Sequence, residues 1–232
     1  MRKKEMKAGL ISAMPMIIGF FPIAMAFGLL AKNTGVNFRD TTLFSAMVFA
    51  GASQFMALDL IADGVSVGSI ILATFLLNLR HLVMSASLSL RLKDVKRSWL
   101  PLVGFGITDE TFSVASFRKE KITIPYILVL FFTSYGSWVL GTIAGYLMGS
   151  ILPQSLQSSL SIGLYAMFVG LLVPELKGSK NILYLAIIGA ILYSIIYYTG
   201  ILHSGWDIIF GIVITSLIGV FIFNDEMEGE RR

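Results

Sequence analysis

The amino-acid sequence predicts an all-α, polytopic integral membrane protein with 6–8 membrane segments. Of its 232 residues, 56% are hydrophobic and 14% are charged, whereas a soluble domain carries about 25% charged residues. A chain of this size has too little interior to hide so much apolar surface from water, so the excess must face lipid. The charged residues also fall in short clusters between apolar runs, as expected at the ends of membrane segments.

Each predicted segment is an apolar run near the length of about 20 residues that a helix needs to cross the hydrocarbon core. The longest run exceeds one crossing, and the Gly, Ser and Pro residues at 149–154 divide it into two helices. The runs are residues 8–31, 41–58, 64–79 with a continuation to 90, 98–117, 122–174, 181–206 and 208–224. We expect a single transmembrane domain over residues 1–232, with a short basic cytoplasmic N-terminus and a short acidic C-terminal tail.

Two of the segments, residues 8–31 and 98–117, are predicted to be broken or re-entrant. Both carry helix breakers, which are Pro15, Gly19 and Pro22 in one and Pro101, Gly104 and Gly106 in the other. If both segments turn back, every Lys and Arg outside the apolar runs lies on the cytoplasmic side, which the positive-inside rule favours. If all segments cross, there are eight crossings and these charges are divided between the two sides of the membrane. They are also divided if only residues 98–117 are re-entrant, which gives seven crossings and an N-terminus on the outside. Two ordinary Pro-kinked spans are a further alternative.

The first of three polar clusters inside apolar segments contains Ser53 and Gln54. Small residues precede them at positions 50–52, and small residues let membrane helices approach closely. An amide such as Gln54 must find a partner in hydrocarbon. The cluster is therefore either a helix-packing face or part of a substrate path.

The second cluster is Asn78, Arg80 and His81. An Arg at the centre of a membrane helix costs about 2.5–3.5 kcal/mol on insertion scales, so it requires a partner or a wet cavity. The alternative is an Arg anchored at the cytoplasmic interface, which needs residues 82–90 to lie in that interface. We interpret Arg80 as a functional residue.

The third cluster is Thr108, Asp109 and Glu110, in the middle of a segment of membrane length. Its two adjacent carboxylates are natural partners for Arg80, and one of them can pair with it while the other exchanges a proton. A polar loop between two short interfacial helices is the alternative. With the first two clusters, these residues form the predicted substrate-binding and translocation path.

Enzyme motifs are absent from the sequence: there is no HExxH, no P-loop and no recognisable Ser/His pair, and there is no cysteine. We therefore expect neither an enzyme nor a bound cofactor or metal. The net charge of +4 comes from residues that flank membrane segments, so it does not indicate nucleic-acid binding. Besides a transporter, the same polar groups fit the selectivity constriction of a channel or the contacts of a non-transporting scaffold.

The clusters resemble motifs of the AzlC family, the large subunit of branched-chain amino-acid exporters in bacteria and archaea. The similar stretches are residues 9–28 with their two prolines, 49–55, 78–81 and 108–112. They lie in order over the first half of the chain, and the second half agrees only as apolar spans.

The resemblance implies an ion- or proton-coupled secondary transporter in the cytoplasmic membrane that exports leucine, isoleucine and valine. It also implies a small second membrane subunit of the AzlD type. On this interpretation Arg80 or the N-termini of broken helices hold the substrate carboxylate. Asp109 or Glu110 attracts the ammonium group or carries a proton, and Gln54 and Asn78 orient the substrate.

Overall fold

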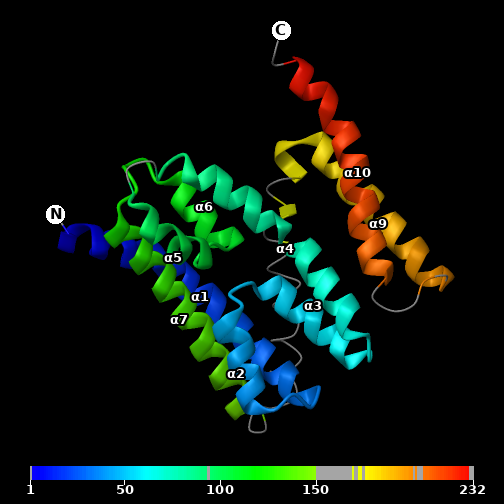
Figure 1. Ribbon diagram of the computed structural model, residues 1–232, viewed down its shortest axis with the longest axis horizontal. Coiled ribbons are helices and arrows are strands. Elements are labelled where there is room, and N and C mark those ends of the chain that lie inside the picture. The colour runs from blue at the N-terminus through cyan, green and yellow to red at the C-terminus, as the bar shows by residue number, and fades with distance from the viewer. Residues whose placement is uncertain are drawn as a thin grey trace. The chain divides into compact units, whose positions relative to one another are not determined.

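Helices make up the regular structure of the residues that the computed structural model describes, and no strand occurs among them. These residues are 2–92, 95–149, 169, 172–173, 176–200, 202 and 206–229, with side chains up to residue 220. The elements in Figure 1 are α1 (Arg2–Asn33), α2 (Phe38–Met47), α3 (Gly51–Ala62), α4 (Val67–Ser89), the 3-10 helix η1 (Arg97–Trp99), α5 (Leu100–Phe105), α6 (Asp109–Phe117), α7 (Ile124–Met148), α9 (Lys180–Thr199) and α10 (Trp206–Gly229). The all-α part of the prediction is confirmed.

Helices α1, α4, α7 and α9 are long and apolar enough to cross a membrane, and α10 contains a shorter apolar stretch at Trp206–Val220. Within the described residues there are thus fewer spanning helices than predicted segments, partly because residues 41–58 and 98–117 form pairs of short helices. Helix α7 ends at Met148, where the division of residues 122–174 was expected. The helix predicted to follow that division falls largely outside the described residues.

The chain forms two units, which are described separately: Met1–Leu58 with Asn78–Leu164, and Asp59–Leu77 with Tyr165–Arg232. In the second unit α9 packs on α10, and Gly189 makes room for Thr215 at their crossing. The first unit contains α1, α2, the start of α3, the end of α4 and all of α5, α6 and α7.

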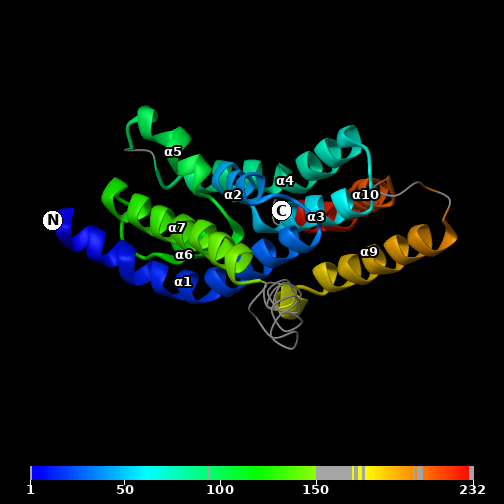
Figure 2. The ribbon, with the colours of Figure 1, turned by 90° about the horizontal axis from the view of Figure 1, so that it is seen from below.

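A close parallel pairing of α1 and α7 forms the frame of the first unit, and Figure 2 shows the two helices side by side. Glycines make the close approach possible. A Cβ at Gly145 would collide with the backbone carbonyl of Met25, and a Cβ at Gly28 would collide with that of Thr142. Small residues at such crossings are the usual means by which membrane helices gain van der Waals contact.

Replacing Gly145 with Ala is expected to lower the thermal stability of the purified protein, because the added methyl group meets rigid backbone rather than a flexible side chain. Overpacking of this kind costs about 1–3 kcal/mol. Gly136→Ala is the matched control on the same helix, since a Cβ there has nothing within 4 Å. Thermal unfolding in detergent measures both variants, and equal midpoints would contradict the proposed close packing.

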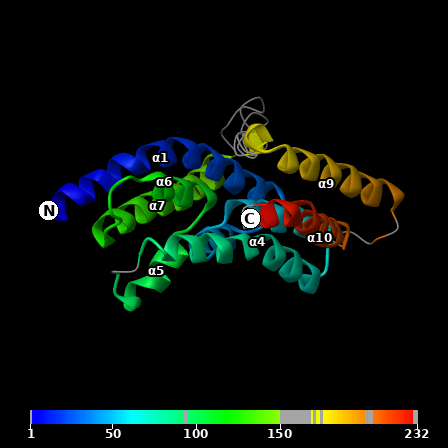
Figure 3. The same cartoon turned by 90° about the horizontal axis from the view of Figure 1, so that it is seen from above.

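The predicted break in residues 8–31 is wrong. Helix α1 is continuous through Pro15 and Pro22, and it curves without interruption in Figure 3. Proline removes one backbone donor and disfavours the preceding turn, but membrane helices tolerate it where neighbouring helices compensate. Here α7 packs along α1 and supplies that support.

The predicted break in residues 98–117 is confirmed, because α5 ends at Phe105 and α6 begins at Asp109. The segment also returns to the end of the unit from which it started. The guanidinium of Arg91, which precedes the segment, donates to the backbone carbonyl oxygens of Ala115, near its end, at 2.9 Å and of Arg118, directly after it. A cation at the carboxyl end of α6 stabilises the free carbonyl groups and the helix dipole there.

Residues 2–7, 91, 96–97 and 118–121 together form what we call the basic end of the first unit. The Glu5 carboxylate forms an ion pair with Arg118 at 2.8 Å and accepts from Thr123, the N-cap of α7, at 2.8 Å, so the starts of α1 and α7 lie at this end. The hydroxyl of Tyr146 donates to the carbonyl of Val36 at 3.1 Å, so the other ends of α1 and α7 also coincide. None of the three topologies derived from the sequence combines these features: residues 2–7, 91 and 118–121 lie at one end, residues 98–117 turn back, and α1 runs the full length of the unit.

A second break, which the sequence analysis did not predict, separates α2 from α3 at residues 48–50. Three hydrogen bonds tie this break to the α1–α7 frame. The hydroxyl of Tyr135 donates to the carbonyl of Ala46 at 2.8 Å, and Trp138 donates to Gln54 at 2.9 Å. The hydroxyls of Ser45 and Thr142 lie 2.8 Å apart. The first unit therefore contains two interrupted helical segments beside two continuous helices.

Candidate functional site

Two interactions bring the three polar clusters together. A guanidinium nitrogen of Arg80 on α4 lies 2.7 Å from a carboxylate oxygen of Asp109 on α6. Two residues earlier on α4, the Asn78 amide donates to the Ser53 hydroxyl on α3 at 3.1 Å. We call the resulting group the polar site; its members are Ser53, Asn78, Arg80, His81, Thr108, Asp109 and Glu110.

The pairing of Arg80 with a neighbouring carboxylate agrees with the sequence-based hypothesis, and Asp109 is the partner. Both side chains are 30% exposed, so the pair is partly screened by solvent rather than fully enclosed. Asp109 occupies the first turn of α6, where the helix dipole favours negative charge. The break before α6 thus supplies a stable position for the carboxylate that neutralises Arg80.

Local hydrogen bonds fix the start of α6. The Thr108 hydroxyl accepts from the backbone N–H of Thr111 at 3.3 Å, and the Thr111 hydroxyl accepts from the backbone N–H of Thr108 at 2.8 Å. This reciprocal arrangement is a capping box, which satisfies two otherwise free donors. Thr108 also donates to a carboxylate oxygen of Glu110 at 2.9 Å, which holds that side chain beside the ion pair.

Three buried polar atoms of the polar site have no hydrogen-bond partner among the described residues: Asn78 Oδ1, Arg80 Nε and His81 Nε2. His81 Nδ1 lies 3.2 Å from the carbonyl oxygen of Asn78, so the tautomer that donates there leaves Nε2 as an acceptor. The site therefore offers two hydrogen-bond acceptors and one donor from about one turn of α4. Buried polar groups are rarely left unpaired, which distinguishes this group from ordinary packing.

Gln54 differs from the other predicted residues because the protein already fills its hydrogen-bonding capacity. Its amide nitrogen donates to the carbonyls of Phe44 and Val48, and its oxygen accepts from Trp138 and, at 3.5 Å, from Ser45. Its exposed fraction is 1%. Gln54 thus joins the break between α2 and α3 to α7, as the helix-packing interpretation expects.

The contribution of α7 to the surroundings of the site was not predicted from the sequence. The ring of Tyr135 contacts Phe49 beside one break and Phe105 beside the other, at centroid distances of 5.5 and 5.4 Å. Ser134, Ser137 and Thr142 are buried on the same helix. These hydroxyl residues inside a long apolar run were the available signal, since buried polar residues in a membrane helix face other protein segments.

Within the described part of the chain, no three His, Cys, Asp or Glu residues are grouped so that they could hold a metal ion. The functional groups of the polar site are one guanidinium, two carboxylates, one amide, one imidazole and two hydroxyls. Such a set suits a small ligand that carries both a positive and a negative group.

Comparison with known proteins gives a consistent result. The family model of the AzlC protein matches residues 15–152. An uncharacterized membrane protein of Archaeoglobus fulgidus is 34% identical over 87% of this chain and 94% of its own length. The inner membrane protein YgaZ of Escherichia coli is 30% identical over 79% of this chain and 78% of its own length. The branched-chain amino acid transport protein AzlC of Bacillus subtilis is 24% identical over 80% of this chain and 74% of its own length. No solved structure matches.

Proposed function

Because this multi-pass inner-membrane chain belongs to the AzlC family, we propose that it is the large subunit of a secondary transporter that exports branched-chain amino acids. Its distant relative in Bacillus subtilis is a branched-chain amino acid transport protein, which supports the substrate class. Proton coupling and a small AzlD-type membrane partner belong to the same proposal, and they rest on the family resemblance.

The observation that carries the proposal is the set of unpartnered atoms beside the Arg80–Asp109 pair. An amino acid presents a carboxylate, which accepts hydrogen bonds, and an ammonium group, which donates them. In the proposed complex the carboxylate accepts from Arg80 Nε, and the ammonium group donates to Asn78 Oδ1 and His81 Nε2. Each substrate group then satisfies a buried atom that otherwise lacks a partner, which favours binding.

Glu110 is the proposed proton carrier. Its carboxylate lies one residue after Asp109 and is held by Thr108, so it shares the site without taking part in the ion pair with Arg80. Two adjacent carboxylates near one cation cannot both be neutralised by it, and the second one gains most from a proton. Proton uptake at Glu110 would thus depend on whether the ion pair between Arg80 and Asp109 is formed.

The basic end is proposed to face the cytoplasm. It carries Arg2, Lys3, Lys4, Lys7, Arg91, Lys96, Arg97, Arg118, Lys119 and Lys121, whereas Lys32 and Arg39 lie toward the opposite end of the first unit. This asymmetry follows the positive-inside rule. The substrate would then enter from the basic end.

Transport by inside-out membrane vesicles tests the function. Vesicles that contain this chain and a small partner subunit are expected to accumulate labelled leucine with saturable kinetics, and an imposed proton gradient is expected to raise the initial rate. Uptake that does not saturate would indicate a channel instead. Absence of uptake by the complete two-subunit complex would favour a scaffold.

Asn78→Leu is expected to raise the KM for leucine about tenfold, because it removes the acceptor Oδ1 and keeps a side chain of similar size. Loss of one such hydrogen bond costs about 1–1.5 kcal/mol, which corresponds to this factor. Ser53→Ala is the control, since it removes the hydroxyl that accepts from the Asn78 nitrogen and donates to the Ala50 carbonyl, and leaves the acceptor Oδ1 of Asn78 in place. Initial rates at several leucine concentrations measure both variants, and equal KM values would argue against a substrate contact at Asn78.

A further inference from the structure

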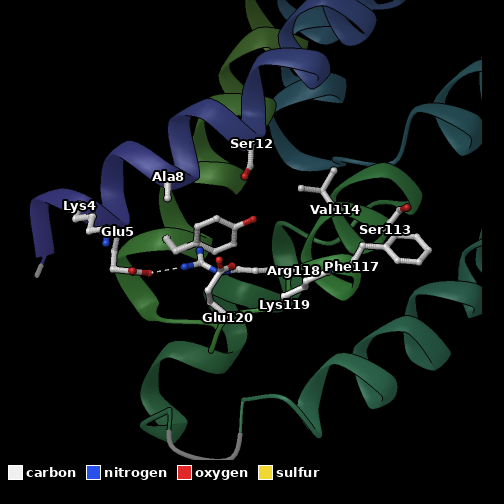
Figure 4. Close-up of a pocket in the computed structure, with 11 residues that line it drawn as sticks. Lys4, Glu5, Ala8, Ser12, Ser113, Val114, Phe117, Arg118, Lys119 and Glu120 are labelled. Atoms are coloured by element: carbon white, nitrogen blue, oxygen red, sulfur yellow. Dashed lines mark hydrogen bonds and ion pairs between the residues drawn. The ribbon is translucent and has the colours of Figure 1, made fainter.

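A pocket of about 620 Å³ opens at the basic end, away from the polar site. Figure 4 shows that α1 forms one wall, while the end of α6 and the following loop form the other. The lining includes charged groups from both walls, namely Lys4, Glu5, Arg118, Lys119 and Glu120, beside the apolar side chains of Ala8 and Phe117.

The centre of the pocket is Arg118, whose position is fixed on two sides. Its guanidinium lies 3.6 Å from the centroid of the Tyr126 ring, and its Nη2 donates to Glu5 at 2.8 Å. The Thr123 hydroxyl donates to the same Glu5 oxygen, also at 2.8 Å, and so holds the carboxylate in place. Arg118 is therefore pre-organised to donate in a defined direction.

Part of this fixed guanidinium still requires an acceptor. The side chain of Arg118 is only 8% exposed, and its Nε and Nη1 are buried without a hydrogen-bond partner among the described residues. The carboxylate of Glu120 lies 3.6 Å from Nε, which is an ion pair at longer range rather than a hydrogen bond. A buried donor on a charged group gains most from an anionic acceptor.

The surrounding charge also favours an anion. Basic side chains here outnumber the two carboxylates of Glu5 and Glu120: Lys4, Arg118 and Lys119 line the pocket, and Arg2, Lys3 and Lys7 lie on the first turns of α1. Glu5 and Glu120 both pair with Arg118. Together they neutralise at most two positive charges, one of which is the Arg118 guanidinium. The remaining positive charge creates a field that attracts an anionic group.

The apolar neighbours indicate where that anion comes from. Phe117 is 84% exposed at the rim, and Leu10, Ile11 and Met14 are exposed on the adjoining turns of α1. In a membrane protein these side chains contact lipid. The pocket thus lies where a lipid-facing apolar surface meets a basic cluster, and basic pockets between membrane helices on the cytoplasmic side bind anionic head groups.

We propose that this pocket binds the phosphate of an anionic phospholipid head group, with Arg118 as the buried donor and Lys4 and Lys119 as flanking cations. The acyl chains then lie along Phe117 and the exposed face of α1. The bound lipid bridges α1 to the loop between α6 and α7, and so fastens the re-entrant segment to the continuous frame.

Thermal unfolding of the full-length protein in neutral detergent tests the proposal, with phosphatidylglycerol, phosphatidylcholine or inorganic phosphate added in separate series. Phosphatidylglycerol is expected to raise the unfolding temperature in a saturable manner, and the other two are expected to leave it unchanged. An equal shift with phosphatidylcholine would overturn the requirement for an anion. An equal shift with inorganic phosphate at comparable concentration would contradict the proposal that the bound anion belongs to a lipid.

Two charge-matched double variants locate the site. Lys4→Gln with Lys119→Gln removes two exposed cations that line the pocket, and is expected to raise the half-saturating concentration of phosphatidylglycerol about tenfold or more. Lys3→Gln with Lys7→Gln removes the same charge at the same end without touching the lining, and is expected to change it less than about threefold. Equal changes would show that only general surface charge attracts the lipid, and would contradict the pocket.

Discussion

Asp109→Asn is expected to slow leucine export about 30- to 100-fold while the protein still accumulates in the membrane. The substitution leaves Arg80 charged, partly buried and without its partner at 2.7 Å. Removing one member of a buried charge pair costs about 2–5 kcal/mol. Because both side chains are 30% exposed, solvent reduces the cost, and the lower part of that range applies.

A double-mutant cycle separates this effect from a general loss of folding. Arg80→Gln should reduce export as strongly as Asp109→Asn, and the double variant should be no slower than the slower single variant, because the two residues act as one unit. Arg80→Lys keeps the charge and removes the Nε donor, so it should restore protein stability but not the leucine KM. Strictly additive losses, or a fully active Arg80→Lys protein, would contradict the proposed roles.

Gln54→Leu is expected to lower the unfolding temperature by roughly 6–12 °C, on the scale of about 2–4 °C per kcal/mol for chains of this length. The variant removes four hydrogen bonds and leaves Trp138 Nε1 and the carbonyl of Val48 without a partner, whereas the carbonyl of Phe44 keeps its bond from the Val48 N–H. Each buried unsatisfied group costs about 1–3 kcal/mol, and partial relaxation keeps the sum near 3 kcal/mol.

The matched control is Asn78→Leu, which makes the same amide-to-leucine change at the polar site. The Asn78 side chain donates one hydrogen bond, to Ser53, and has an unpartnered oxygen. Its variant should therefore lose affinity for leucine and keep most of its stability, whereas the Gln54 variant should lose stability first. Thermal unfolding and transport kinetics on both proteins decide this, and the reverse pattern would exchange the roles of the two amides.

Chemical complementarity made the Arg80–Asp109 pair predictable from the sequence. A cation and a carboxylate inside apolar segments are costly apart and must find each other. The same rule could not assign a role to Gln54. An amide whose partners are protein groups and an amide that binds substrate look alike in the sequence. Only the positions of Phe44, Val48 and Trp138 distinguish them.

Tertiary packing explains the elements that the sequence did not predict. Pro15 and Pro22 indicated a broken segment, but glycines more than a hundred residues away on α7 let that helix support α1 along its length. Conversely, residues 41–58 contain no charged residue and no proline, yet they break at residues 48–50. Hydrogen bonds from α7 stabilise that break, and local propensity carries no information about such distant partners.

The hydrogen bond from Trp138 to Gln54 also provides an optical signal at the break between α2 and α3. Trp138 is 2% exposed, whereas the other two tryptophans, Trp99 and Trp206, are 39% and 42% exposed. With those two replaced by Phe, the remaining indole would emit from an apolar, hydrogen-bonded environment. Its emission wavelength and its quenching by acrylamide would then follow the hydration of the break while leucine is bound and released, without an attached dye.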